Sequence, residues 1–240
     1  MKFIAIIPAR FESTRFPGKP LADIKGKSMI QRVYEQAKKV EKLSRVIIAT
    51  DDQRIIDHCK HIGAEVMMTS NNHRNGTERI AEVMRNIGEE FEVVLNIQGD
   101  EPFVKTEQIE LLCDMISKEE NQIASLAKLI SEQRELESIN TVKVVMDKNS
   151  KALYFSRFAI PFQRQINMST PHYKHIGMYA FKSNILQELI HLPISPLEQS
   201  ESLEQLRWLE SGYAIGMGIT TFDSFGIDSP EDLIEAIKSI

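Results

Sequence analysis

The sequence lacks the features that mark several common classes of protein. It has only 2 cysteines in 240 residues, Cys59 and Cys113, and neither has a CxxC partner or the spacing of metal ligands. Both fall in expected helices and are interpreted as buried, reduced thiols. No apolar run approaches the roughly 18 residues that cross a membrane, and the first run, residues 3–7, is too short for a signal peptide. These absences predict a cytoplasmic protein without membrane insertion.

An excess of basic residues is also lacking. The formal net charge is −5 at pH 7, with 29 Lys and Arg against 34 Asp and Glu. A general nucleic-acid binder carries a basic domain, so no nucleic-acid partner is expected. Local clusters of cations are therefore expected to bind a small anionic ligand. The hydrophobic content of 42% is ordinary for a globular protein, and a chain of 240 residues can bury a sizeable core.

Two familiar phosphate-binding motifs are absent. Gly26-Lys27-Ser28 looks like the end of a P-loop, but that motif requires glycine at position 21, where Leu21 stands. No G-x-G-x-x-G follows the first expected strand, so the usual dinucleotide fingerprint is missing. A phosphate site in this chain would have to be built in another way.

The loop at residues 8–20 has the composition of such a site. It follows a short buried strand at residues 3–7 and precedes a helix that begins near Ser28. The loop holds cations, small hydroxyls and turn-forming residues, namely Arg10, Arg15, Lys19, Ser13, Thr14, Pro17, Gly18 and Pro20. Charges, hydroxyl donors and free backbone N–H groups can bind a polyphosphate. The alternative is a solvated basic turn that binds nothing.

The rest of the chain alternates strands and helices. Apolar runs predict strands near residues 45–50, 65–68, 91–97, 123–127, 142–146, 177–181 and 214–220, and helical spacing predicts helices near 29–37, 55–62, 80–87, 109–116, 184–191, 197–210 and 231–240. Continuous apolar strands separated by helices predict a parallel sheet covered on both faces. Thr77 is expected to cap the third helix. Residues 154–173 are less periodic and are interpreted as an excursion that forms a subunit contact.

Three polar segments are expected to meet at one edge of this sheet. In open α/β sheets the ligand crevice lies beyond the carboxyl ends of the strands. Residues 8–20 and 98–102 follow expected strands directly, and residues 70–79 follow a third. We therefore expect these segments to face one another.

Two carboxylates are candidates for binding a divalent cation. Asp100 comes directly after an expected strand, where an acidic residue often binds Mg²⁺ that is itself bound to phosphates. Asp228 precedes the last helix. The alternatives are a turn in which Asp100 bonds its own backbone, and simple capping of the last helix by Ser229.

Polar residues in the second half of the chain could bind a hydroxyl-rich acid. Glu201 and Gln205 are four residues apart in the expected helix 197–210 and hence on one face, which could equally be a solvated surface. Arg157 and His175 flank the excursion and could bind a carboxylate or lie at the surface.

Several sequence blocks, considered together, carry a resemblance to a known family. They are residues 7–20, 73–79, 96–102, 152–157, 175–179, 195–198, 203–207 and 226–232. In this order, over nearly the whole chain, they resemble the 3-deoxy-manno-octulosonate cytidylyltransferases, also called CMP-Kdo synthetases. The chain departs from the family at Pro161-Phe162, where a Pro-Trp pair is usual, and in the short link before His175.

The resemblance implies a Rossmann-like α/β nucleotidyltransferase fold, with a mixed, mostly parallel sheet, helices on both faces and a dimerisation excursion. Residues 1–240 would form a single domain, and residues 142–175 the dimerisation subregion of a homodimer. The implied reaction transfers CMP from CTP to 3-deoxy-D-manno-octulosonate (Kdo) and releases pyrophosphate, for lipopolysaccharide biosynthesis, with Mg²⁺ as cofactor.

The resemblance also implies roles for individual residues. Those that bind the nucleotide would be Pro8, Ala9, Arg10, Ser13, Arg15 and Lys19, with Asn75, Gly76, Thr77 and Arg79 around the cytidine and Gln98 beside them. The sugar would contact Gln98, Arg157, His175, Tyr179, Glu201 and Gln205. Asp100 and Asp228 would hold Mg²⁺, and the catalytic residues would be Arg10, Lys19 and Asp100.

The implied chemistry is in-line attack of the anomeric oxygen of the sugar on the α-phosphorus of CTP. In such a reaction the protein contributes mainly positioning and charge neutralisation. Two alternatives stay open, a cytidylyltransferase for sialic acid and a nucleotide-binding protein that has lost catalysis. A glycosyltransferase is disfavoured because Asp100 is followed by Glu101 and Pro102, so no D-x-D stands at the strand end.

Overall fold

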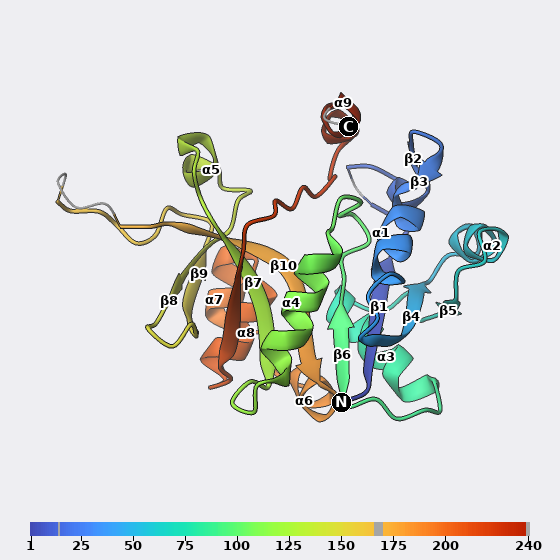
Figure 1. Cartoon of the computed structure of the whole chain (residues 1–240), viewed down its shortest axis with the longest axis horizontal. Coiled ribbons are helices and arrows are strands. Elements are labelled where there is room, and N and C mark those ends of the chain that lie inside the picture. Colours follow the sequence, from blue (N-terminus) through green and yellow to red (C-terminus); the bar gives the residue numbers. More distant parts are fainter. Residues whose placement is uncertain (14, 166–169, 239–240) are drawn as a thin grey trace. The chain divides into compact units, whose positions relative to one another are not determined.

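The computed structural model describes residues 1–13, 15–165 and 170–238 (Figure 1). Thr14 of the first loop, residues 166–169 of the excursion and the last two residues of the expected final helix lie outside the described residues. The chain forms two compact units, Met1–Glu110 with Ser224–Ile240, and Leu111–Asp223. The expectation of a single domain over residues 1–240 stays a prediction.

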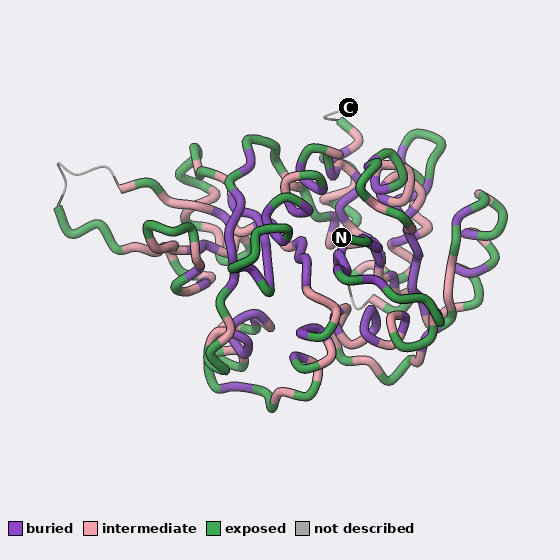
Figure 2. Tube along the Cα trace, turned by 60° about the horizontal axis from the view of Figure 1, so that its bottom comes forward, coloured by how far each residue is buried: buried purple, intermediate pink, exposed green. Residues whose placement is uncertain are grey.

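The first unit contains parallel strands in the order β6-β1-β4-β5. These strands are β1 (Phe3–Ala9), β4 (Leu43–Thr50), β5 (Val66–Met68) and β6 (Val93–Asn96). In β1, Ala5 lies opposite Val46 of β4 and Leu95 of β6, and Ile4, Ile6 and Ile7 are fully buried. Figure 2 shows the buried parts of the chain in purple. Helices that cover both faces of a parallel sheet explain why its strands are continuously apolar. The parallel arrangement expected from the sequence is confirmed here.

The helices of the first unit follow the predicted order. They are α1 (Met29–Ala37), α2 (Gln53–His61), α3 (Gly76–Asn86) and α9 (Pro230–Lys238), and the division between the units falls within α4 (Thr106–Ser117). A 3-10 turn, η1 (Lys19–Leu21), and a short hairpin of β2 (Asp23–Ile24) and β3 (Lys27–Ser28) lie between β1 and α1. The Ser28 side chain accepts a hydrogen bond from the Gln31 N–H and so caps α1.

The expectation that Thr77 caps α3 is wrong. Asn75 precedes the helix with an extended backbone (φ −148°), and its Oδ1 accepts a hydrogen bond of 2.9 Å from the Glu78 N–H. Thr77 is already inside the helix and is buried. An asparagine caps a helix as well as a threonine does, and here Asn75 holds the capping position.

The second unit combines parallel and antiparallel strands. Strand β7 (Ile123–Leu129) pairs antiparallel with β10 (Tyr173–Lys182) and parallel with β11 (Ile215–Thr220), while β8 (Lys143–Met146) and β9 (Ala152–Ser156) form an antiparallel pair. Helices α5 (Gln133–Glu137), α6 (Ser183–Leu189), α7 (Pro196–Glu201) and α8 (Glu204–Glu210) complete the unit. Both strand directions occur, as the expected mixed sheet requires. No helix within the described residues has the length and apolarity to span a membrane.

The single helix expected over residues 197–210 is instead two helices, α7 and α8. Ser202 between them has a left-handed backbone (φ 52°, ψ 49°), and Leu203 after it is extended (φ −131°). Glu201 therefore ends one helix and Gln205 lies in the first turn of the next. Glu201 and Gln205 therefore do not share the face of one helix, and that prediction is wrong.

A buried lysine ties the segments around β8 and β9 together, and we expect its loss to destabilise the protein. Lys143 is fully buried, and its Nζ donates to the carbonyl oxygens of Ser138 (2.8 Å), Thr141 (2.7 Å) and Arg157. In Lys143→Met three carbonyls lose a charged donor, so the free energy of unfolding should fall by about 3 kcal/mol. Urea denaturation measures this change. The matched variant Lys148→Met, at an exposed position, should change it by less than about 0.5 kcal/mol, and equal effects would contradict the prediction.

Candidate active site

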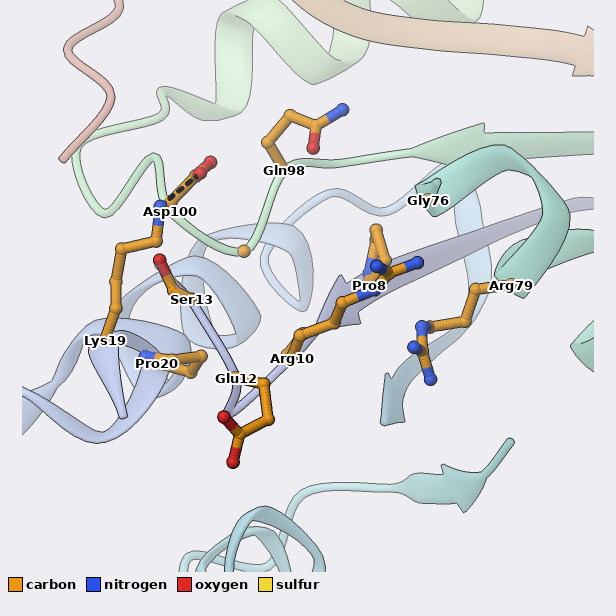
Figure 3. Close-up of a pocket in the computed structure, with 12 residues that line it drawn as sticks. Pro8, Arg10, Glu12, Ser13, Lys19, Pro20, Gly76, Arg79, Gln98 and Asp100 are labelled. Carbon is orange, nitrogen blue, oxygen red and sulfur yellow. Dashed lines mark hydrogen bonds and ion pairs between the residues drawn. The ribbon is translucent and has the colours of Figure 1, made fainter. Parts of the chain in front are cut away.

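A pocket in the first unit is lined by the three segments that were expected to meet (Figure 3). Its volume is about 360 Å³. The lining residues are Pro8 and Ala9 at the end of β1, Arg10, Glu12, Ser13, Lys19 and Pro20 after it, Gly76 and Arg79 in α3, and Gln98, Gly99 and Asp100 after β6. The geometric expectation for residues 8–20, 70–79 and 98–102 is thus confirmed.

The loop after β1 is closed by its own backbone. The Gly18 N–H donates to the Phe11 carbonyl (2.8 Å), and Gly18 takes a left-handed conformation (φ +73°) that glycine adopts without strain. The Phe11 ring lies under Gly18 and also carries the Arg54 guanidinium 3.2 Å from its centroid. Lys19 follows directly as the first residue of η1, so this closure presents its side chain to the pocket.

The carboxyl side of the pocket is assembled from two distant parts of the chain. Asp100 comes after β6, and its carbonyl accepts a hydrogen bond of 3.0 Å from the Ile227 N–H. Ile227 is fully buried in a small core with Ile24 and Met29. This packing places the neighbouring Asp228 beside Asp100, which is a contact that no local sequence signal indicates.

The cations of the loop contact these two carboxylates. Lys19 Nζ lies 2.8 Å from Asp100 Oδ2 (Figure 3) and 3.1 Å from Asp228 Oδ1, and an Arg15 nitrogen lies 3.0 Å from Asp228 Oδ2. Burial lowers the pKa of Lys19, but the carboxylates of Asp100 and Asp228 outweigh it and raise that pKa above its ordinary value. Burial raises the pKa of Asp228, and Lys19 and Arg15 lower it overall. The Lys19 ammonium and the Asp228 carboxylate are therefore both charged at neutral pH.

Both sequence-based alternatives for the carboxylates can now be compared with the structure. The Asp100 side chain points to Lys19. Ser229 does act at the start of α9, because its Oγ accepts from the Asp232 N–H (3.3 Å), while Asp232 accepts from the N–H groups of Asp228 and Ser229. The cap of α9 formed by Ser229 therefore does not exclude a role for Asp228, whose carboxylate contacts Lys19. The described residues contain no group of three or more His, Cys, Asp or Glu side chains arranged to hold a metal.

Two arginines of the expected nucleotide site are held by the protein itself. Arg10 donates to the carbonyl of His73, which connects the first loop to residues 70–79. Arg79 is fully buried, and its guanidinium donates to Thr69 Oγ1 and to Asp51 Oδ2, the latter at 2.6 Å. No motif in the sequence indicates Asp51 and Thr69 as partners of Arg79, because they lie 28 and 10 positions away along the chain.

The structure places the expected nucleotide residues in three situations. Pro8, Ala9, Arg10, Ser13, Lys19, Gly76, Arg79 and Gln98 line the pocket. Arg15 contacts Asp228, while Asn75 caps α3 and Thr77 is buried in it. Glu12, Pro20 and Gly99 also line the pocket, although none of the three was among the residues expected to bind the nucleotide.

The residues expected to contact the sugar, apart from Gln98, belong to the second unit, and four of them form two clusters. His175 packs against Tyr179 (ring centroids 5.3 Å apart), and its Nε2 is 2.9 Å from Ser125 Oγ. Glu201 accepts hydrogen bonds from Ser156 Oγ (2.6 Å) and the Arg157 N–H (2.9 Å), and Arg157 Nε donates to the Glu201 carbonyl (2.7 Å). Gln205 is buried in α8.

The buried imidazole of His175 should make stability depend on pH. Burial lowers the pKa of His175 to about 3, whereas an unfolded histidine titrates near about 6.5. Between these values the unfolded chain binds a proton that the folded chain does not, so stability falls as the pH falls, by up to about 1.4 kcal/mol per pH unit. From pH 7.5 to 5.0 the wild type should therefore lose about 2 kcal/mol more than His175→Phe in urea denaturation. Equal losses would contradict this assignment.

The site and the fold together define a class of protein. A cationic loop after the first strand of a parallel sheet, opposite two carboxylates, suits the binding of a nucleotide and its phosphates. A family model described as cytidylyltransferase matches residues 4–219. The chain belongs to this family.

Individual relatives narrow the class. A protein of Parabacteroides distasonis named 3-deoxy-manno-octulosonate cytidylyltransferase is 51% identical over 246 residues, which cover 99% of this chain and 97% of the relative. A protein of Thermodesulfovibrio yellowstonii with the same name is 47% identical over 251 residues, with coverage of 100% and 98%. The resemblance found in the sequence analysis is confirmed.

Solved structures agree with this assignment. A structure of CMP:2-keto-3-deoxy-manno-octonic acid synthetase complexed with CTP has a TM-score of 0.94 and 39% identity, and covers 100% of this chain and 98% of its own. A 4-diphosphocytidyl-2C-methyl-D-erythritol synthase from Anaerococcus prevotii has a TM-score of 0.65 at 16% identity, which shows the fold alone. The expected α/β nucleotidyltransferase fold with a mixed, mostly parallel sheet is therefore confirmed.

Proposed function

We propose that this cytidylyltransferase transfers CMP from CTP to Kdo and releases pyrophosphate, in the biosynthesis of lipopolysaccharide. The observation that carries the proposal is the meeting of Lys19, Asp100 and Asp228 beside a pocket lined by the loop after β1. Relatives that are 44–51% identical over nearly the whole chain share the corresponding name. The nucleotide is assigned to the pocket of the first unit.

The chain's own residues would act mainly by positioning and by neutralising charge. Arg10, Ser13 and Lys19 line the pocket from one loop and would bind the triphosphate, with Arg15 at its outer edge. Two unit charges about 4 Å apart attract by roughly 4 kcal/mol at an effective dielectric constant of about 20, and by less where solvent screens them. Pro8 and Gly76 are closely packed, because a Cβ atom at Gly76 would lie 3.1 Å from Pro8 Cγ. Both residues line the pocket and would form its wall beside the cytidine.

The residues present fit a magnesium ion. Asp100 and Asp228 direct one oxygen each at a single cation, the Lys19 ammonium, and Mg²⁺ is commonly bound by one or two carboxylates together with phosphate oxygens. Asp100 and Asp228 would hold the ion, which supplies charge neutralisation at the phosphates when bound. The dependence on Mg²⁺ is part of the proposal.

The sugar contacts are proposed for Gln98 and for the two clusters of the second unit. His175 is neutral and Tyr179 packs on it, while Glu201 and Arg157 each bind a backbone group of the other.

A homodimer in the cytoplasm is also proposed. Its support is the exposure of two large aromatic side chains within residues 142–175, Phe158 (76%) and Phe162 (84%).

The release of pyrophosphate tests the proposed reaction. The full chain is incubated with CTP and Mg²⁺, and with Kdo, sialic acid or no sugar. Release that requires Kdo supports the proposal. Release with sialic acid instead, or binding of CTP without any release, would replace it with one of the two alternatives.

A further inference from the structure

The Lys19 ammonium lies where two carboxylates converge. Its distances to Asp100 Oδ2 and Asp228 Oδ1 are 2.8 and 3.1 Å, and only 12% of its side chain is exposed. Arg15 contacts the other oxygen of Asp228, but its side chain is 64% exposed. Lys19 is therefore the buried partner of both carboxylates, and Arg15 is a peripheral one.

The three side chains are held by ordered backbone. Lys19 begins η1, where the Leu21 N–H donates to the Gly18 carbonyl (2.9 Å) and the Ala22 N–H to the Lys19 carbonyl (3.0 Å). Asp100 is tied to the buried Ile227 by a backbone hydrogen bond. The contact between the lysine and the carboxylates is therefore built into the folded unit.

In this arrangement the carboxylate pair and a phosphate group of the nucleotide would compete for the same lysine. A divalent cation bound by both carboxylates would occupy the region that the ammonium occupies, and two cations repel each other at such a distance. An ammonium group bound to a phosphate oxygen, in contrast, is no longer available to the carboxylates. The nucleotide and the divalent cation therefore do not bind independently.

The geometry points to Lys19 as a placeholder that occupies the divalent-cation site until a nucleoside triphosphate draws its ammonium away. The protein alone binds a divalent cation weakly, and the triphosphate exposes the two carboxylates as it binds Lys19. By linkage, the two ligands bind with positive cooperativity. This inference rests on the proposed function, because it requires that the pocket binds a triphosphate.

The inference is tested by the binding of Mn²⁺ to the full chain without nucleotide, because CTP itself chelates the metal. Free Mn²⁺ is measured by its paramagnetic resonance signal for the wild type, Lys19→Met, Lys19→Arg, Arg15→Met and Lys105→Met. Lys105 is an exposed lysine of the same unit and provides the matched control. Thermal melting with and without Mn²⁺ is the second readout, and Lys19→Gln provides a second neutral variant if Lys19→Met does not fold.

The expected result is that Lys19→Met binds Mn²⁺ at least tenfold more tightly than the wild type and is stabilised by it. Lys19→Arg and Lys105→Met should bind as the wild type does, and Arg15→Met should change the affinity less than threefold. Equal affinities for Lys19→Met and the wild type would overturn the inference. Equal gains for Lys19→Met and Arg15→Met would also overturn it, because they would indicate general electrostatics.

Failure of this inference is distinguishable from failure of the proposed function. If the wild type releases pyrophosphate with Kdo but Lys19→Met gains no affinity for Mn²⁺, only the placeholder role of Lys19 is rejected. If the wild type binds no CTP, the proposed function is rejected, and the proposed cooperativity is rejected with it.

Discussion

Replacement of Asp100 by asparagine should lower the rate of pyrophosphate release by roughly 10³-fold without unfolding the protein. The neutral amide removes one of the two carboxylates proposed to hold Mg²⁺, and such an anchor contributes several kcal/mol of charge stabilisation in the transition state. It also removes the closer of the two partners of Lys19. The assay uses saturating CTP, Kdo and Mg²⁺, and thermal melting checks the fold.

A matched exposed carboxylate provides the control for Asp100→Asn. Asp114 lies on an exposed position of α4, so Asp114→Asn should keep the rate within about twofold of the wild type. Near-native turnover of Asp100→Asn with Mg²⁺ present would remove Asp100 from the proposed metal site.

A single methyl group at Gly99 should reduce both stability and turnover. A Cβ atom there would lie 2.7 Å from the Pro8 carbonyl oxygen and 3.2 Å from Ile30 Cδ1. Pro8 is in β1 and lies opposite Ala49 of β4, so its carbonyl cannot move without the sheet. Gly99→Ala should therefore lower the free energy of unfolding by about 2–3 kcal/mol in urea denaturation. Displacement of the adjacent Asp100 should lower turnover by about 10²-fold.

Gly226 provides the comparison for Gly99. A Cβ atom at Gly226 meets no atom within 4 Å, so Gly226→Ala should change the free energy of unfolding by less than about 0.5 kcal/mol. If both alanine variants were equally stable, the close approach of Gly99 to Pro8 would not be a constraint on the fold.

Much of the first unit could be predicted from its sequence because its signals are local. The buried strands β1, β4 and β6 are apolar runs, and the helices between them have clear apolar faces. The break at Ser202 could not be predicted, because neither glycine nor proline marks the left-handed residue between α7 and α8. The competition between Asn75 and Thr77 for the cap of α3 likewise depends on one backbone angle that the sequence does not specify.

The sequence predicted which segments form the site, but it did not predict which side chains contact one another there. The rule that ligands lie beyond the carboxyl ends of strands brought three loops together correctly. The ion pairs of Lys19 with Asp100 and Asp228 span 81 and 209 positions, and no periodicity reports such distances. The burial of Arg79 against Asp51 was missed for the same reason, since a motif shows which residues occur and not which partners satisfy their charges.

The return of the chain to its first unit has a consequence for how the protein is made. Ser224–Ile240 joins Met1–Glu110 although 113 residues of the second unit, Leu111–Asp223, are synthesised in between. Ile227 and Asp228 leave the ribosome long after Lys19 and Asp100 have been translated. While the second unit is being synthesised, a nascent chain therefore displays its cationic loop with only one of the two acidic partners, and the charge-balanced site is completed only after Asp228 has been translated.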